Sequence, residues 1–218
     1  MSELLVIGAD GMLGRCWTEL LTARGIEHVA TELADLDSTD YVFDGTATTP
    51  YRTDHALKPV NAYGRSKALG EELIARSGVE HLLVRSSWLY APWATNFVLT
   101  MRELTKSRGS LRVVDDQRGR PTDSRRLAEV SLDLAEKGSL GIFHVTDGGE
   151  CSWFELAALI GEVVNPDCRV EPCTSDEFPR PAPRPAYSVL DISATEDLVG
   201  PLIPWEDRVR DVLALLEG

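Results

Sequence analysis

The sequence predicts an α/β fold with a mostly parallel sheet and a smaller C-terminal lid. Short apolar runs that are typical of buried strands alternate with helical patterns through the first two thirds of the 218 residues. The first run, residues 3–8, ends in a glycine-rich turn, and an amphipathic helix and a second strand-like run at 27–32 follow. Strand, glycine turn, helix and strand in this order are typical of a Rossmann-like dinucleotide-binding unit.

Later elements follow from apolar periodicity, capping signals and proline content. Ser152 and Glu155 are spaced as a capping box ahead of an apolar helical face. The proline-rich stretch 178–191 suits neither a helix nor a central strand, so we expect an ordered loop or a linker there. In chain order, strands are expected at 38–43, 80–90, 111–123 (with a turn) and 141–148, and helices at about 61–76, 96–109, 123–138, from 152 onward and at 204–218.

This pattern divides the chain into two parts. Residues 1–144 are expected to form the Rossmann-like dinucleotide-binding domain, with a shortened sheet. Residues 145–218 are expected to form a small substrate-binding lid rather than more sheet, with contributions from 88–100.

Composition limits the classes of function. The net charge of −13, from 22 Lys and Arg against 35 Asp and Glu, lacks the basic footprint of a nucleic-acid binder. No run of about 18 apolar residues predicts a membrane span, and no basic region precedes the short N-terminal apolar run, so no signal peptide is expected. Because the four cysteines form no CxxC pair, we interpret them as reduced thiols of a cytoplasmic protein.

Three glycines, Gly8, Gly11 and Gly14, form a G-x-x-G-x-x-G turn between the first strand and the first helix. Such glycines permit a tight turn, the approach of a pyrophosphate to the backbone, and close helix–strand packing. A plain tight turn is the alternative, but the position between strand and helix favours dinucleotide binding. Glu32 ends the second strand, where it is either an acceptor for the adenosine ribose hydroxyls or a solvated loop acid.

Tyr63 and Lys67 are four residues apart on an expected helix and therefore share one face. A nearby ammonium lowers the pKa of a phenol from its ordinary value of about 10. Such a tyrosine can donate a proton to a carbonyl oxygen while a hydride reaches the carbon. Thr39 precedes Tyr63 by 24 residues, at an expected strand end where its hydroxyl could hold the same oxygen. The alternative is an exposed pair on a surface helix.

The glycine turn and the Thr39, Tyr63 and Lys67 set resemble an extended short-chain dehydrogenase/reductase. Later motifs are more specific, and in order they resemble the dTDP-4-dehydrorhamnose reductase family: STDYVFDGT, NAYGRSK, LLVRSSWLYA, DDQRGRPT, FHVTDGG and FPRPAPRPAYSVLD. The resemblance covers essentially the whole chain. It implies NAD(P)H-dependent reduction of the 4-keto group of a dTDP-4-keto-6-deoxyhexose in deoxysugar biosynthesis, with either NADPH or NADH as cofactor.

The resemblance also implies roles for individual residues. Tyr63 matches the proton donor, Lys67 its partner, and Thr39 the hydroxyl beside them. The implied cofactor-binding residues are Gly8, Asp10, Gly11, Met12, Leu13, Gly14, Glu32 and Lys67.

The substrate pocket that the resemblance implies draws on three stretches of the chain. Asp40 and Tyr41 line the pocket, and Trp88 matches the aromatic residue of the sugar site. Asn96 and the segment around Arg184 match regions that hold the nucleotide. Arg184 suits a pyrophosphate because its guanidinium presents a planar fork of donors, although a solvated loop arginine is the alternative.

One departure from the family pattern changes the expectations. After about residue 37, roughly 60 residues that would supply a central strand and a nicotinamide-flanking strand end are missing. The stretch between 32 and 38 is too short for a parallel crossover, which normally needs about a dozen residues. Three interpretations remain open: a reductase that tolerates the deletion, a non-catalytic nucleotide-binding or regulatory relative, and a sequence made shorter than its natural parent.

Expectations about further ligands and partners come from the same comparison. Glu32 would repel a 2′-phosphate and favours NADH, whereas the family often accepts NADPH. No bound metal is expected, because Arg125 and Arg126 stand where an interface carboxylate might be wanted. The expected partner is a dTDP-sugar, with no nucleic acid and no membrane, and the resemblance leaves a homodimer open.

Overall fold

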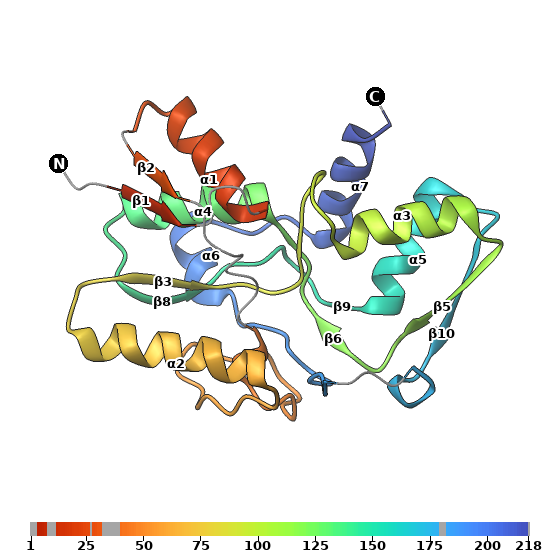
Figure 1. Cartoon of the computed structure of the whole chain (residues 1–218), viewed down its shortest axis with the longest axis horizontal. Coiled ribbons are helices and arrows are strands. Elements are labelled where there is room, and N and C mark those ends of the chain that lie inside the picture. Colours follow the sequence, from red (N-terminus) through yellow and green to blue (C-terminus); the bar gives the residue numbers. More distant parts are fainter. Residues whose placement is uncertain (1–3, 8–11, 27, 32–39, 179–181, 218) are drawn as a thin grey trace.

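The computed structural model describes residues 4–7, 12–26, 28–31, 40–178 and 182–217 of the chain (Figure 1). Helices alternate with parallel strands, which confirms the predicted α/β class. Among the strands of these ranges, four two-stranded ladders are parallel and one is antiparallel. No helix within them is both long and apolar enough to span a membrane.

The N-terminal unit has the predicted order of strand, helix and strand. It consists of β1 (Leu4–Ile7), α1 (Met12–Ala23) and β2 (His28–Thr31), and the two strands pair in parallel. Because α1 begins shortly after β1 ends, its N-terminal turn lies at the carboxyl edge of this ladder, where α/β proteins bind nucleotides.

Gly25 ends α1, as its place in the sequence predicts. Its φ of 66° lies in the left-handed region, which glycine adopts at little cost. The amides of Gly25 and Ile26 donate to the carbonyls of Thr22 and Leu21 at 3.1 and 2.9 Å and satisfy the helix end. Leu21 is fully buried where α1 packs against α4 (Ser124–Glu136).

The strand expected at 38–43 is wrong for the part that the structure describes. Asp40–Val42 form a 3-10 turn, η1. A strand needs neighbouring backbone groups to bond with, and no strand in the described ranges pairs with this segment. The amide of Lys58 instead donates to the carbonyl of Val42 at 2.8 Å, and the side chains of Val42 and Phe43 are completely buried.

The middle of the chain builds a second parallel ladder. In Figure 1, α2 (Ala62–Ser77) lies below β3 (Leu82–Arg85) and β8 (Gly141–His144), which pair in parallel. The predicted helix and both predicted strands are confirmed, although the first strand is interrupted. Its last part, β4 (Leu89–Tyr90), pairs with β7 (Thr122–Asp123) instead.

The parallel sheet is split in the described part of the chain. No ladder between the described strands joins the β1–β2 pair to the β3–β8 pair. Leu82, Leu83 and Val84 of β3 are consequently only half-buried, although apolar strands of this kind are fully covered in intact parallel sheets. The resemblance implies that a central strand is missing after about residue 37, and this stays a prediction.

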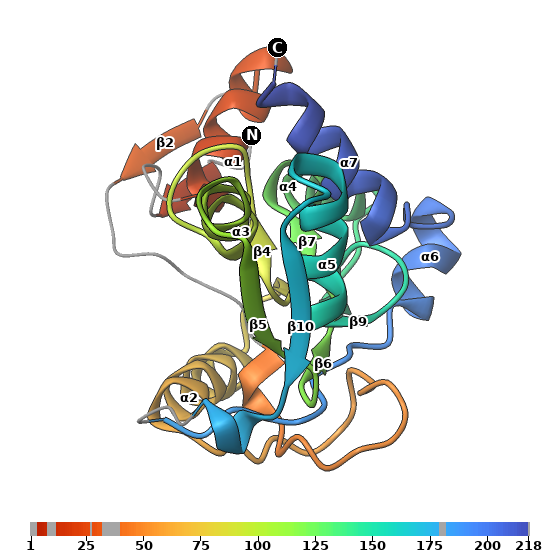
Figure 2. The same ribbon diagram turned by 90° about the vertical axis from the view of Figure 1, so that its right-hand side faces the viewer.

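The C-terminal part packs helices against a third ladder. β5 (Ser110–Val114) and β10 (Arg169–Cys173) pair in parallel and lie side by side in Figure 2. Three predicted helices are confirmed around them: α3 (Phe97–Ser107), α5 (Trp153–Val164) and α7 (Trp205–Leu215). The Ser152–Glu155 capping box at the start of α5 is also confirmed.

The expectation that residues after 145 add no sheet is wrong. Besides β10, the short strand β9 (Cys151–Ser152) pairs antiparallel with β6 (Arg118–Gly119). Pro172 lies within β10 and weakens its strand signal, since proline is confined to sheet edges.

Two further elements were not predicted, the 3-10 turn η2 (Ser175–Glu177) and α6 (Ser193–Val199). The domain boundary at 144/145 stays a prediction.

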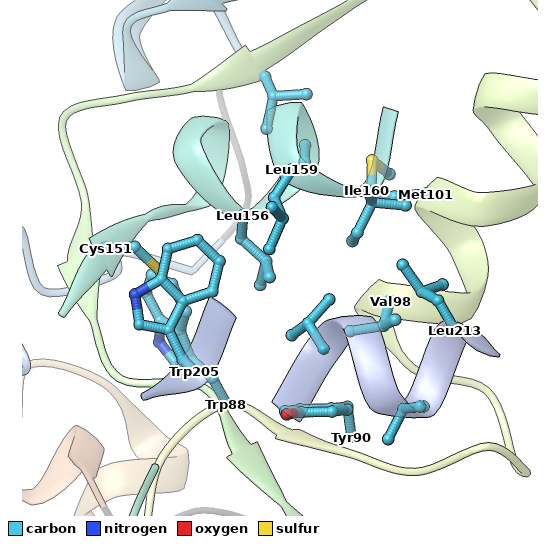
Figure 3. Packing of buried hydrophobic residues seen from close by; sticks show 14 of the residues in the cluster. Trp88, Tyr90, Val98, Met101, Cys151, Leu156, Leu159, Ile160, Trp205 and Leu213 are labelled. Atoms are coloured by element: carbon cyan, nitrogen blue, oxygen red, sulfur yellow. The ribbon is translucent and has the colours of Figure 1, made fainter. Parts of the chain in front are cut away.

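The largest hydrophobic cluster fills the space between α3, α5 and α7 (Figure 3). Its aromatic members Trp88, Tyr90 and Trp205 pack with aliphatic side chains such as Met101 and Leu156. Burial of such side chains stabilises the fold by about 1.5–3 kcal/mol each. The C-terminal part therefore has a core of its own.

All four cysteines are free, as their spacing predicts, and the structure buries them. Cys16 lies in α1, whereas Cys151, Cys168 and Cys173 belong to the C-terminal part. Burial raises the pKa of the Cys16 thiol to about 12, and it also raises the pKa of Cys151 well above its usual range. These thiols are therefore protonated at neutral pH.

Candidate active site

The first two turns of α2 carry the predicted catalytic pair. Asn61 caps this helix, since its side-chain oxygen accepts from the amide of Gly64 at 2.8 Å. Tyr63 and Lys67 lie one turn apart on the same face, as predicted, with the Lys67 ammonium 5.3 Å from the centroid of the Tyr63 ring. The Tyr63 side chain is 36% exposed, so a ligand can reach it.

Tyr41 lies beside this pair. Its ring meets the Tyr63 ring edge-on, with the centroids 6.0 Å apart and the planes at 85°. Close packing of α2 on η1 makes the contact possible: a Cβ atom on Gly64 would lie 2.0 Å from the Tyr41 carbonyl oxygen. Gly64 is therefore required for the approach of the two elements, and the structure brings Tyr41, a predicted substrate residue, to the catalytic pair.

The segment that carries Arg184 is attached to the start of α2. The side-chain amide of Asn61 donates to the carbonyl of Pro183 at 3.2 Å. Pro185 packs against Gly45, whose φ of 77° and lack of a side chain allow the contact. Arg184 itself is exposed between these two anchors. The structure thus places the backbone beside Arg184 next to the helix of Tyr63.

Trp88 is part of the core of the C-terminal half rather than an exposed ring. Its indole is 8% exposed and stacks on Trp153 with the centroids 3.6 Å apart. A side chain on Gly119 would collide with that indole. The backbone of Trp88 has a φ of 48°, which is uncommon for a non-glycine residue and indicates a turn that the packing imposes.

Asn96 uses its side chain to cap α3. The side-chain oxygen accepts from the amide of Leu99 at 3.0 Å, and the side-chain nitrogen donates to the carbonyl of Ala91 at 2.8 Å. It also lies within reach of the carbonyls of Trp93 and Ala94. The structure therefore shows a capping role for Asn96, and its predicted role in holding the nucleotide is untested.

Several predicted residues lie outside the described ranges. Of the cofactor turn, Met12, Leu13 and Gly14 form the first turn of α1, and Gly14 is buried. Asp40 belongs to η1, but its side chain is not described. The remaining predicted residues outside the described part are Gly8, Asp10, Gly11, Glu32 and Thr39.

Three buried residues beside the catalytic helix were missed by the sequence analysis. Glu71 of α2, Arg85 of β3 and His144 of β8 form one connected polar group. Two signals could have indicated it: Glu71 follows Lys67 by one helical turn, and Arg85 ends an otherwise apolar strand. Burial lowers the pKa of His144 to about 4, and the Arg85 charge adds to this shift, so the imidazole is neutral.

Fold and site together define a Rossmann-like α/β protein of the short-chain dehydrogenase/reductase type, with a Tyr-x-x-x-Lys helix beside a parallel ladder. The family can be stated more closely. The chain belongs to the RmlD substrate binding domain family, whose model matches residues 37–217, and this places it among relatives of the dTDP-4-dehydrorhamnose reductases.

Named relatives support this assignment. The chain is 42% identical over 176 residues to the spore coat polysaccharide biosynthesis protein SpsK of Bacillus subtilis. This match covers 81% of this chain and 62% of the relative. It is 39% identical over 186 residues to the dTDP-4-dehydrorhamnose reductase of Mycolicibacterium smegmatis, covering 83% of this chain and 57% of the relative. The chain thus spans about 60% of the length of such curated relatives.

Solved structures show the same fold. A dTDP-4-dehydrorhamnose reductase of Clostridium acetobutylicum matches with a TM-score of 0.91 and 30% identity, and all of both chains is covered. The enzyme of Bacillus anthracis, solved in complex with NADP, matches with a TM-score of 0.89 and 26% identity over 98% of this chain and 99% of that chain. The Rossmann-like fold is therefore shared with structures of nucleotide-sugar reductases.

Within the described ranges, His, Cys, Asp and Glu side chains form no group of three or more that could hold a metal ion. The expectation that the protein binds no metal stays a prediction.

Proposed function

We propose that this chain is an NAD(P)H-dependent reductase that acts on the 4-keto group of a dTDP-4-keto-6-deoxyhexose. The single observation that carries the proposal is the arrangement at the start of α2. There, Tyr63 and Lys67 share one face, Tyr41 flanks them, and Asn61 holds the Arg184 segment beside them. Family membership supports the reaction class, because relatives of this chain are named as reductases of such substrates.

In this proposal, Tyr63 is the general acid. Its hydroxyl donates a proton to the oxygen of the 4-keto group, and the exposed position of its ring allows that contact. Lys67 stabilises the tyrosinate that remains after the transfer, since its ammonium lies 5.3 Å from the ring centroid. Thr39 is assigned to the same carbonyl oxygen on the basis of the resemblance alone.

The residues present fit a dinucleotide at the carboxyl edge of β1. α1 begins at Met12, within the glycine motif, so the backbone amides of its first turn would donate to a pyrophosphate at this edge, and Gly14 is buried there. When bound, the nicotinamide supplies the hydride. Lys67 would also contact the cofactor, and Glu32 would accept from the adenosine ribose. The choice between NADPH and NADH is decided by competing titrations.

The dTDP-sugar is assigned to the surface between α2 and the Arg184 segment. An exposed guanidinium such as that of Arg184 suits the pyrophosphate, since it can donate two parallel hydrogen bonds. Asp40 and Tyr41 would line the sugar end, and Trp88 and Asn96 would support the pocket wall from the C-terminal part. This assignment agrees with the acidic net charge, which requires local cations for an anionic ligand.

The proposed reaction is tested by an absorbance assay of nicotinamide oxidation with purified protein and a dTDP-4-keto-6-deoxyhexose. Turnover that depends on both the keto sugar and the reduced dinucleotide is expected. A parallel reaction with dTDP-glucose, which has no 4-keto group, serves as the control and is expected to give no oxidation. A protein that binds both ligands in calorimetry without any turnover would refute the reductase.

A second candidate function is nucleotide binding without turnover, and one observation favours it. Between the described strands, no ladder joins β1–β2 to β3–β8, so the two halves of the cofactor cradle are not held in one sheet. Such a relative is expected to bind dTDP and to show no oxidation of NADPH or NADH. Calorimetry with the three ligands separately, combined with the absorbance assay, distinguishes the two functions.

A further inference from the structure

We propose that Arg85 is a positioning residue that holds the catalytic helix α2 and the Arg184 segment in one fixed frame, through Glu71 on one side and His144 on the other. The inference rests on the proposed function, because it assigns the frame a task in the reduction of the keto sugar. Arg85 touches neither ligand in this account. It acts through the elements that carry Tyr63, Lys67 and Arg184.

The first arm of the frame is the ion pair between Arg85 and Glu71. The Arg85 Nε donates to both carboxylate oxygens of Glu71 at 3.0 and 3.2 Å, and Nη2 donates to Oε2 at 2.7 Å. The two side chains are only 2% and 8% exposed. Because Glu71 lies one turn beyond Lys67 on α2, this pair fixes the rotation of the catalytic helix relative to β3.

The second arm runs through His144. The Arg85 Nη1 lies 3.2 Å from His144 Nε2, and His144 Nδ1 lies 3.0 Å from the carbonyl oxygen of Asp191. Neutral imidazole satisfies both contacts when Nε2 accepts from Arg85 and Nδ1 donates to Asp191. Nη1 also donates to the carbonyl oxygen of Thr53 at 3.2 Å. Arg85 is thus bonded to α2, to β8 and to the loop at Thr53.

Both ends of the segment 183–191 are then held in the same frame. Asp191 is fixed by His144, and its amide donates to the carbonyl of Tyr51 at 2.8 Å. At the other end, Asn61 at the start of α2 donates to the carbonyl of Pro183. The contacts therefore run from α2 through Arg85 and His144 to the segment 183–191. Asn61 connects the other end of this segment back to α2.

These contacts explain how a split sheet can still position its catalytic groups. In an intact sheet, ladder hydrogen bonds would also hold β3 and β8 to the strands of the cofactor side, and no ladder joins β1–β2 to β3–β8 between the described strands. A buried bidentate guanidinium–carboxylate pair sets both distance and orientation. Displacement of reacting groups by about 1 Å can reduce a rate by about 100-fold, so the frame is expected to affect kcat.

The test compares four variants of the full chain. Glu71→Gln removes the ion pair with Arg85. Arg85→Lys keeps the positive charge but loses the planar set of guanidinium donors. The double variant Glu71→Leu/Arg85→Met replaces the pair by apolar side chains of similar volume, which often preserves or restores stability. The matched control is Glu72→Gln, because Glu72 pairs with Arg76 on the exposed face of the same helix, with side chains 59% and 75% exposed.

For a positioning role, we expect kcat to fall by about 100-fold in Glu71→Gln while KM for the keto sugar changes by less than about threefold. The kcat of Arg85→Lys should fall less than that of Glu71→Gln, and Glu72→Gln should have the kcat of the parent. The double variant should regain the melting temperature of the parent but keep the low kcat. If the double variant recovers turnover together with stability, the pair is only structural and the inference is wrong.

A second readout is independent of turnover. In hydrogen exchange of the full chain, Glu71→Gln should lower the protection of peptides from α2 and from 187–191 together, whereas Glu72→Gln should lower neither. Loss of protection in α2 alone would refute the frame. If the parent oxidises no nicotinamide with the keto sugar, the proposed reductase fails, and the exchange of 187–191 still supports or overturns the coupling by Arg85.

Discussion

At the scale of single residues, the chemistry of this chain depends on Tyr63 and its neighbour Lys67. The sequence predicted the pair because four residues separate them on a helix, and the structure confirms that they share a face. Their environment was not predictable, since the contacts of Tyr41 and Gly64 depend on how η1 packs against α2.

The first prediction concerns the proton donor. Tyr63→Phe removes only the hydroxyl, so turnover of the keto sugar should fall by about 100-fold or more while the ring contact with Tyr41 is kept. The dissociation constant for dTDP should change little, and calorimetry checks this as the control. Unchanged turnover in the absorbance assay would show that another group donates the proton.

The second prediction concerns Asp147, a buried carboxyl group outside the proposed site. Its Oδ2 accepts from the Tyr90 hydroxyl at 2.8 Å and from the Asp123 amide at 3.1 Å. Burial raises the pKa of Asp147 to about 7, and the nearby Asp123 charge adds to this shift while the two hydrogen bonds oppose it. The folded state therefore binds a proton that the unfolded state, with a pKa of about 4, releases.

Because the folded pKa is the higher one, Asp147 contributes stability at low pH, and that contribution is lost as pH rises from about 4 to about 7. Asp147→Asn keeps an oxygen acceptor and cannot titrate. The free energy of unfolding of the variant, relative to the parent, should therefore rise with pH by an amount on the order of a few kcal/mol. Urea unfolding across this range measures it, with the exposed Asp167→Asn as the control, and parallel curves for Asp147→Asn and parent would contradict it.

At the scale of elements, α2 shows why some helices can be predicted and their packing cannot. The helix was expected at about 61–76, and the structure caps it with Asn61 and Gly78. Its exposed leucines at 69 and 73 do not follow from the pattern, since an amphipathic helix is expected to bury its apolar face. Both leucines lie two residues from Glu71, which pairs with Arg85 of β3, so they are on the face of α2 that points away from this strand.

Two glycines in this helix give a matched prediction. Gly64→Ala would bring a Cβ atom to 2.0 Å from the Tyr41 carbonyl oxygen, so α2 must move away from η1. We expect lower thermal stability and reduced turnover. Gly70→Ala meets no atom within 4 Å and should stabilise the helix by about 0.5–1 kcal/mol. Melting temperatures that shift in the same direction for both variants would contradict this account.

Strands were predicted less well than helices. The apolar runs that became β1, β3 and β8 were apparent, because the residues in each are mostly apolar. The strand expected at 38–43 failed in its described part because a strand depends on partners far away in the chain. β10 was missed for the opposite reason, since its partner β5 stabilises a run with little strand character of its own.

At the scale of the whole molecule, the split between the two parallel ladders makes the cofactor side the weaker part of the site. We expect NADPH and NADH to bind with lower affinity than dTDP, because each hydrogen bond that the missing groups would have made is worth about 0.5–1.5 kcal/mol. The substrate side keeps its frame around α2 and 183–191. Separate calorimetric titrations check the order of affinities, and tighter binding of either dinucleotide than of dTDP would reverse it.

The rate at which each buried thiol is labelled reports how often the structure around it opens. A thiol that is shielded from solvent reacts with a maleimide or disulfide reagent only after the surrounding structure opens. Cys16 reports on the small N-terminal unit, whereas Cys151 and Cys168 report on the C-terminal core and Cys173 reports on the end of β10. We expect Cys16 to be labelled first in timed mass spectrometry, with the other three following together. Simultaneous labelling of all four would mean that the two parts open as one cooperative body.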